Sequence, residues 1–150
     1  MLAKRETNRD GPRGDTPEKI VREFIRRINR RDIERLTQLM TDNHVLIDSL
    51  GHRLQGGRQA MHAAWAGYFQ MVPDYQIRAK TIFGRRNTVI VVGRASGSYM
   101  APTMTDPVGT WCTPATWRAV VRRGRVAEWQ VYADNEPIRA LMRQTGEKAV

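Results

Sequence analysis

Apolar positions in the first half of the chain recur at the spacing of helices. Residues 16–31 are predicted to form one helix, because Thr16 is a favourable cap and Pro17 suits the first turn. A second, short helix is predicted from Asp32 to Met40, and a third follows the apolar stripe from Met61 to Val72. The apolar face of the first helix consists of Ile20, Val21, Phe24, Ile25 and Ile28. Each predicted helix therefore has one face suited to a core.

The second half of the chain changes to the alternating period of strands. A short strand is already predicted at residues 44–49, ahead of the third helix. Four further strands are predicted at residues 75–83, 88–100, 111–121 and 125–133, joined by turns or by a loop over 101–109. A final helix begins after Asp134 or Asn135. Helices segregated from an antiparallel meander predict the α+β class.

Composition narrows the class of protein without naming an activity. The chain has 150 residues, the usual size of one domain, and we expect residues 1–15 to form a disordered basic tail ahead of a domain at 16–150. We find no long apolar segment and no secretory leader, so a soluble, cytoplasmic protein without membrane contact is expected. Cys112 is the single cysteine, which excludes an intrachain disulfide and a cysteine-based metal cluster.

The net charge of +10, with 21 arginines, raises the question whether the protein binds nucleic acid. The arginines are spread over helices, turns and tail, and no nucleic-acid motif accompanies them. We therefore expect no specific nucleic-acid partner, although adventitious binding at low salt is expected. A nucleic-acid function would require the arginines to gather on one face of the folded chain.

Three segments carry a resemblance to a known superfamily. Residues 16–51 resemble the opening of steroid delta-isomerases, with two helices and then a strand that ends in Asp48 with Gly51 three residues later. The VPDY segment at 72–75 is similar to the junction between the third helix and the long hairpin in SnoaL-like proteins. Residues 126–138, VAEWQVYADNEPI, resemble the last strand and its exit in the same superfamily. The chain thus resembles the SnoaL-like, ketosteroid isomerase-like superfamily with the nuclear transport factor 2-like fold.

This resemblance implies a cone-shaped, curved antiparallel sheet packed with helices around an apolar pocket. It also implies a homodimer through the convex sheet face, where Glu128, Gln130 and Tyr132 would lie. Members of the superfamily include isomerases, polyketide cyclases, dehydratases, epoxide hydrolases and proteins without known chemistry, so fold alone does not give function.

Asp48 is the candidate catalytic residue, because the resemblance places it on the isomerase's general base. A carboxylate facing an apolar cavity takes a proton from carbon next to a carbonyl when desolvation brings its pKa towards the working pH. The alternative is that Asp48 only caps the turn at 49–51. The isomerase's oxyanion hole is missing in this register, since Phe24 and Thr116 occupy the places of its tyrosine and protonated aspartic acid. Classical ketosteroid isomerisation is therefore not expected.

A comparison with limonene epoxide hydrolase gives a similar result. Arg94 matches the arginine of that enzyme's relay, but Ser96 and Val131 fall where its two acids should be. His44, His52 and His62 match no zinc signature, so no metal and no cofactor are predicted, although His44 or His52 could approach Asp48.

The leading hypothesis is a SnoaL-like protein that binds an apolar or polycyclic ligand, with isomerase, cyclase or dehydratase chemistry through Asp48 as general acid or base. The alternative is a non-catalytic ligand-binding or dimerisation module of the same fold. Arg94 and Arg118 either enter the pocket or lie on the strand surface. The candidate substrate-binding residues are Phe24, Trp65, Tyr68, Arg94, Thr116, Arg118, Trp129 and Val131.

Overall fold

The computed structural model describes residues 14–146, so most of the predicted amino-terminal tail lies outside the described residues. The elements in chain order are α1 (Pro17–Asn29), α2 (Ile33–Gln38), β1 (Met40–Ile47), β2 (Arg53–Leu54), α3 (Gly57–Met71), β3 (Gln76–Arg85), β4 (Thr88–Tyr99), β5 (Gly109–Arg122), β6 (Arg125–Ala133) and α4 (Glu136–Gln144). Within this part of the chain, no helix is both long and apolar enough to cross a membrane.

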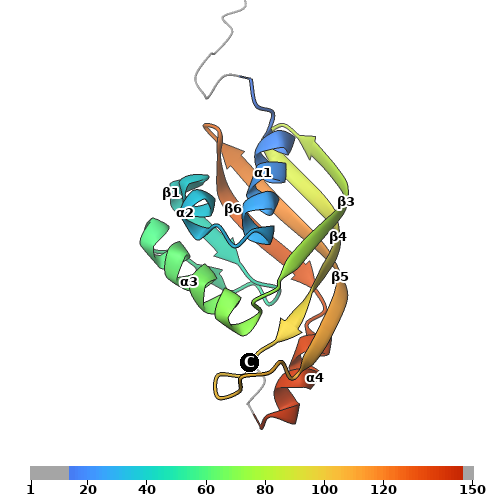
Figure 1. Ribbon diagram of the computed structural model, residues 1–150. Coiled ribbons are helices and arrows are strands. Elements are labelled where there is room, and N and C mark those ends of the chain that lie inside the picture. Colours follow the sequence, from blue (N-terminus) through green and yellow to red (C-terminus); the bar gives the residue numbers. More distant parts are fainter. Residues whose placement is uncertain (1–13, 147–150) are drawn as a thin grey trace, which may run out of the picture.

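One curved, unclosed sheet organises the fold. Its six strands lie in the order β2-β1-β6-β5-β4-β3, and every pair is antiparallel except β1 with β6. Register shifts at Ala79/Thr81 and at Val120/Val121 increase the local bend of the long strands. The sheet curves around α1, α2 and α3, while α4 lies at the far end of β5 (Figure 1). The α+β class and the curved sheet predicted from the sequence are confirmed.

Local signals explain the helices that line this sheet. Thr16 accepts a hydrogen bond from the backbone N–H of Lys19, and Asp32 accepts one from that of Arg35, so both predicted caps are confirmed. The start of α4 differs, because Asn135 makes no side-chain cap and Asp134 Oδ1 accepts the N–H of Glu136 instead, at 2.9 Å.

The first strand differs from its prediction. It begins at Met40, not at residue 44, because Met40 pairs in parallel with Val126 on β6. The second helix accordingly ends before Met40. The two-residue strand β2, which pairs with the end of β1, was not predicted. Both differences come from pairing between distant segments.

The core fills the space between helices and sheet. Phe24, Trp117 and Trp129 are fully buried, and the ring centroids of Phe24 and Trp129 lie 4.9 Å apart. The larger core also includes Val21, Ile28, Leu36, Met40, Met61, Val72, Val89 and Val91. Trp129 belongs both to this core and to the wall of the cavity between the sheet, α3 and α4.

Candidate functional site

An apolar cavity of about 320 Å³ opens between the end of β1, α3, the strands β4 to β6, and α4. Five aromatic side chains supply much of its wall: Trp65, Tyr68, Tyr75, Trp111 and Trp129. Smaller apolar groups such as Ala64, Ala95 and Val131 complete it. Apart from the tyrosines, the polar side chains that line it are Asp48 and Ser49 after β1, Thr113 on β5, and Asn135 and Arg139 at or near the start of α4.

Strand alternation explains which side chains reach the cavity. On β6, Trp129, Val131 and Ala133 line it, while the intervening Gln130 and Tyr132 face the other side of the sheet. Tyr132 is accordingly 50% exposed. The predicted assignment of faces along this strand is correct, whereas the homodimer through the outer face stays a prediction.

Five of the nine predicted site residues line the cavity: Asp48, Trp65, Tyr68, Trp129 and Val131. Phe24 is not among the lining residues, because it is buried in the core behind Trp129. It supports the wall of the cavity from behind.

Arg94, Thr116 and Arg118 do not line the cavity, and for the two arginines the structure agrees with the alternative that they lie on the strand surface. Arg94 is exposed, and its Nε lies 3.2 Å from Cys112 Sγ on the outer face of the sheet. Arg118 donates to Glu128 Oε2 at 3.3 Å, and Thr116 pairs with Tyr132 on β6. Successive residues of a strand point to opposite faces, and these three share the parity of the outer face. The β4 residue that does line the cavity is Ala95, next to Arg94.

Asp48 lies directly after β1, and its carboxylate is occupied by the turn that follows. Its Oδ1 accepts the backbone N–H groups of Leu50 and His52, each at 2.9 Å, and its Oδ2 lies 3.1 Å from His52 Nδ1. Partial burial pushes the pKa of Asp48 upwards, but these hydrogen bonds from His52 and Leu50 outweigh it and hold the pKa below its ordinary value. Asp48 is therefore both the cap of its turn and an ionised group at the cavity.

The side of the cavity next to Asp48 is joined to α4. Asn135 Nδ2 donates to Ser49 Oγ at 2.6 Å, which links the turn after β1 to the start of the helix. Arg139 on α4 also lines the cavity, and among residues 14–146 no carboxylate lies within ion-pair distance of its guanidinium. Glu136, one turn earlier, is paired with Arg143 instead. Arg139 is thus the cation with unused donors beside the cavity.

The tyrosines supply neutral hydroxyl groups. Burial raises the pKa of Tyr68 well above its ordinary value, and the neighbouring Tyr75 adds to the effect. Burial likewise raises the pKa of Tyr75. The two rings pack edge to face with centroids 5.0 Å apart. Both side chains therefore remain phenols at any physiological pH.

The indole nitrogens of Trp65, Trp111 and Trp129 are buried without a hydrogen-bond partner. Since these atoms have almost no accessible surface, the tryptophans present ring carbon to the cavity. A ligand here meets a mainly apolar wall, with polar groups confined to a few positions.

No cluster of side chains in residues 14–146 has the composition of a metal site. His44 is buried and bonds to the carbonyl of Val126 at 2.7 Å, whereas His62 pairs with Glu34 at 2.8 Å. Of the three histidines, His52 is the one that reaches Asp48, as the sequence allowed.

Several lining residues were missed by the sequence analysis: Ser49, Tyr75, Trp111, Thr113, Asn135, Arg139 and Met142. Trp111 and Thr113 share the parity of Ala115 and Trp117, so strand alternation was a usable signal. For Arg139 and Met142 no such signal exists, because α4 reaches the cavity only through tertiary packing.

The curved sheet, packed with helices around an apolar cavity, defines an α+β protein of the nuclear transport factor 2-like and ketosteroid isomerase-like fold. The SnoaL-like domain family matches residues 21–129, so the chain belongs to this family. No curated protein matches it significantly in sequence.

Solved structures agree on the fold. A protein of Shewanella putrefaciens, provisionally described as a SnoaL-like polyketide cyclase, is 11% identical with a TM-score of 0.74, and the match covers 88% of each chain. A provisional polyketide cyclase of Xanthomonas campestris is 17% identical with a TM-score of 0.72, covering 84% of this chain and 98% of that one. IdmH of Streptomyces antibioticus, with the same provisional description, is 18% identical with a TM-score of 0.70, covering 86% and 99%.

Proposed function

We propose that this chain binds an apolar, aromatic small molecule in the cavity between α3, α4 and the inner face of the sheet. The observation that carries the proposal is the cavity itself, about 320 Å³ in volume and walled by five aromatic side chains. This volume lies at the lower end of the range of ligand pockets, roughly 300–1,000 Å³. The occupant is therefore a compact molecule of two or three fused rings, not a long chain.

Polar groups fix the orientation of this ligand. Arg139 has unused donors, and the hydroxyl of Tyr68 stays protonated. Both favour an acceptor oxygen on the ligand, such as a ketone or a carboxylate. Asp48 contributes negative charge on the β1 side, although hydrogen bonds from its own turn occupy its oxygens. The ring system then packs against the tryptophans.

A second candidate function is proton transfer by Asp48. It is favoured by the position of Asp48 at the cavity and by its contact with His52, which offers a route for the proton to solvent. In an isomerisation, the carboxylate would take a proton from carbon beside the ligand's carbonyl and return it to another carbon, with no net change in atoms. The lowered pKa of Asp48 makes it a weak base, so binding without turnover is the primary proposal.

The provisional descriptions of the related structures agree with both candidate functions. The related structures described provisionally as polyketide cyclases point to ring-bearing ketones as the ligand class to test first. That description belongs to those proteins and is extended to this chain as part of the proposal.

The test is a thermal-shift screen of two- and three-ring aromatic ketones and their carboxylic acids. A ligand present at a hundred times its dissociation constant stabilises the protein by about 2.7 kcal/mol. Ala64→Phe should abolish the shift, because Ala64 lines the cavity and a phenyl ring there fills it. Ala63→Phe, at the neighbouring exposed position of α3, is the matched control. A shift that survives Ala64→Phe would place the ligand elsewhere and refute the proposal.

Turnover is followed on the same ligands with Asp48→Asn and Asp74→Asn. Both carboxylates accept backbone N–H bonds in turns, but only Asp48 lines the cavity; Asp74 is bonded to Ser98 at 2.6 Å. Turnover lost in Asp48→Asn and kept in Asp74→Asn establishes proton transfer. Binding without turnover in the wild type leaves a carrier or a sensor.

A further inference from the structure

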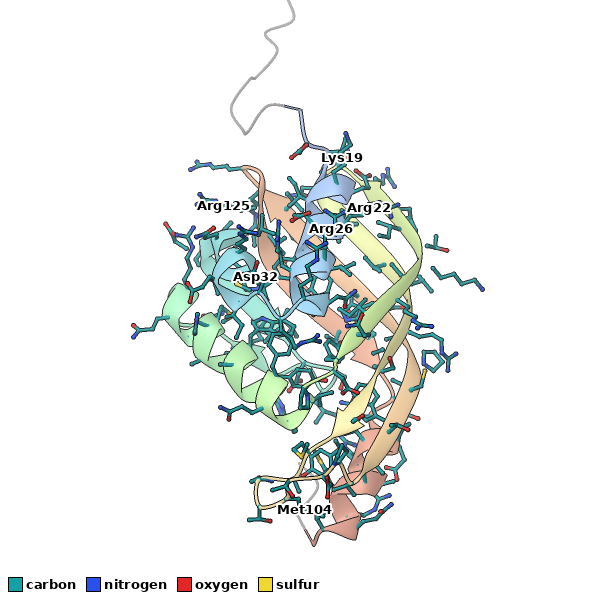
Figure 2. The ribbon with its side chains drawn as sticks, in the orientation of Figure 1. Lys19, Arg22, Arg26, Asp32, Met104 and Arg125 are labelled. Carbon is teal, nitrogen blue, oxygen red and sulfur yellow. The ribbon has the colours of Figure 1, made fainter. Side chains whose placement is uncertain are left out.

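Seven basic side chains from three elements gather at the end of the molecule farthest from α4. They form what we call the basic end: Lys19, Arg22, Arg85, Arg86, Arg122, Arg123 and Arg125. Figure 2 shows Lys19 and Arg22 on α1 and Arg125 at the start of β6 at this same end, away from Met104 and α4. The cavity, which α4 helps to line, lies towards the opposite end.

Direct contacts join the three elements of the basic end. Glu18, in the first turn of α1, packs directly over Gly84 in the hairpin between β3 and β4. The backbone N–H of Val121, near the end of β5, donates to the carbonyl of Asn87 in the same hairpin at 2.8 Å. The two hairpin tips and the start of α1 are therefore one continuous surface.

Ion pairs neutralise several arginines elsewhere in the described residues, but none at the basic end. Elsewhere, Arg58 pairs with Asp42 and Arg118 with Glu128, and Arg26 and Arg27 share Glu23. Within residues 14–146, none of the seven cations of the basic end has a carboxylate within 4.0 Å. Glu18, which packs over Gly84 in this surface, is not ion-paired with any residue in the described part of the chain. The surface thus carries a large uncompensated positive charge.

The hairpins keep these arginines at a conformational cost. Arg86 and Arg123 have φ values of 57° and 51°, a left-handed backbone that favours glycine or asparagine over arginine. Arg122 and Arg125 lie directly opposite each other across β5 and β6, where like charges repel. Arg31, which follows α1 outside the basic end, has a similar φ of 56°, so what distinguishes the basic end is that two such turns occur beside a pair of opposed arginines.

We propose that the basic end binds nucleic acid through the phosphate backbone, independently of base sequence. Six of its seven cations are arginine, whose planar guanidinium pairs with phosphate through two hydrogen bonds. Cations spread over three elements match the closely spaced phosphates of a nucleic acid. An anionic membrane fits less well, because Phe83 is the one large apolar side chain exposed beside these arginines on β3, and surface insertion needs an apolar face.

The basic end meets the condition that the sequence analysis set for a nucleic-acid function. Nucleic-acid binding required the arginines to cluster in the fold, and the basic end supplies such a cluster. It remains consistent with the absence of a base-reading motif, since phosphate contacts position a protein without reading sequence. Binding here is independent of the cavity and of the proposed small-molecule ligand.

The test measures fluorescence anisotropy of labelled random-sequence oligonucleotides, single-stranded and duplex, between about 50 and 200 mM salt. A variant with less positive charge at the basic end, called the reduced variant, carries Arg86→Asn, Arg123→Asn and Arg125→Gln. Asparagine tolerates the left-handed backbone, so folding should be preserved. We expect affinity to fall by about tenfold or more and the slope of log K against log salt to drop by about 2–3, roughly 0.9 for each lost phosphate contact.

The matched control carries Arg30→Gln, Arg78→Gln and Lys80→Gln, three exposed cations outside the basic end that also lack an ion pair. It removes the same charge, and it should keep most of the wild-type slope. Equal losses in the two variants would show that net charge alone drives binding and would overturn the proposal. So would binding to phosphatidylserine vesicles with no binding to either oligonucleotide. If the reduced variant does not fold, Lys19→Gln with Arg22→Gln on α1 replaces it in the same comparison.

Discussion

The cavity and the basic end are built on the same strands, yet they use their side chains in opposite ways. At the cavity, Trp129 is fully buried in the core and also lines the ligand space. At the basic end, Arg86 and Arg123 occupy exposed turns and form no ion pair within residues 14–146. At the cavity, the same residues thus serve stability and the proposed ligand binding. At the basic end, the residues proposed to bind are not the ones that stabilise the fold.

This difference shows where function can change without loss of the fold. A cavity walled by core residues changes its shape only together with the core. Surface arginines contribute little to folding, so their number and position vary independently of the structure beneath them. We expect mutations in the two regions to separate in this way.

Trp129→Ala should have the largest effect. Its ring packs against Phe24 at 4.9 Å and stacks on Trp117 at 6.4 Å, so truncation leaves a large void. We expect the free energy of unfolding to drop by about 3–5 kcal/mol, measured by urea denaturation. Ligand binding in the cavity should weaken at the same time, while oligonucleotide binding by the remaining folded protein is unchanged. Phe83→Ala, at an exposed ring, is the control and should cost far less.

Removal of His44 should have an intermediate effect, since this buried ring anchors β1 to β6 just behind the basic end. The carbonyl of Val126 lies 2.7 Å from its Nδ1, which must therefore carry the proton. Truncation to Ala leaves that carbonyl short of a partner, and we expect a loss of about 1–3 kcal/mol for the hydrogen bond alone, besides lost packing.

His44 also predicts how stability depends on pH. Burial lowers its pKa, and the Val126 hydrogen bond only partly offsets this effect. Because the folded protein then binds fewer protons than the unfolded chain, stability is fully present above the unfolded pKa and declines as the pH falls below it. Urea titrations at a series of pH values check this sign, and His44→Ala should remove that part of the slope. A stability that rises on acidification through this range would contradict it.

Much of the fold could be predicted from the sequence, because the patterns that specify helices and caps are local. The helical stripe of α1 and the cap at Thr16 depend on residues within a few positions of one another. The start of β1 at Met40 was missed, since it is decided by Val126, far along the chain. Predictions from spacing succeed where the partner is near in sequence and fail where it is distant.

The site was predicted less well, for a related reason. Trp129 and Val131 line the cavity, on the face of β6 opposite to the outer face predicted for Gln130 and Tyr132. Thr116 and Arg94 were placed by matching positions to two enzymes of the superfamily, and such a match does not preserve which face a residue points to. The buried neighbours Ala115, Trp117 and Ala119 already put Thr116 and Arg118 on the outer face. The contribution of Arg139 could not be foreseen, because it depends on how α4 packs.

Arg123→Asn should have the smallest effect and a reversed sign. The left-handed backbone at Arg123 costs an ordinary residue about 1–2 kcal/mol, and asparagine reduces that cost. The change also removes positive charge beside Arg122 and Arg125. We expect the free energy of unfolding to rise by about 0.5–1 kcal/mol in urea denaturation, while oligonucleotide affinity falls. If this surface is selected for phosphate contact, Arg123→Asn should gain stability and lose binding. A variant that loses both would show that Arg123 supports the fold. The contrast between the cavity and the basic end would then no longer hold.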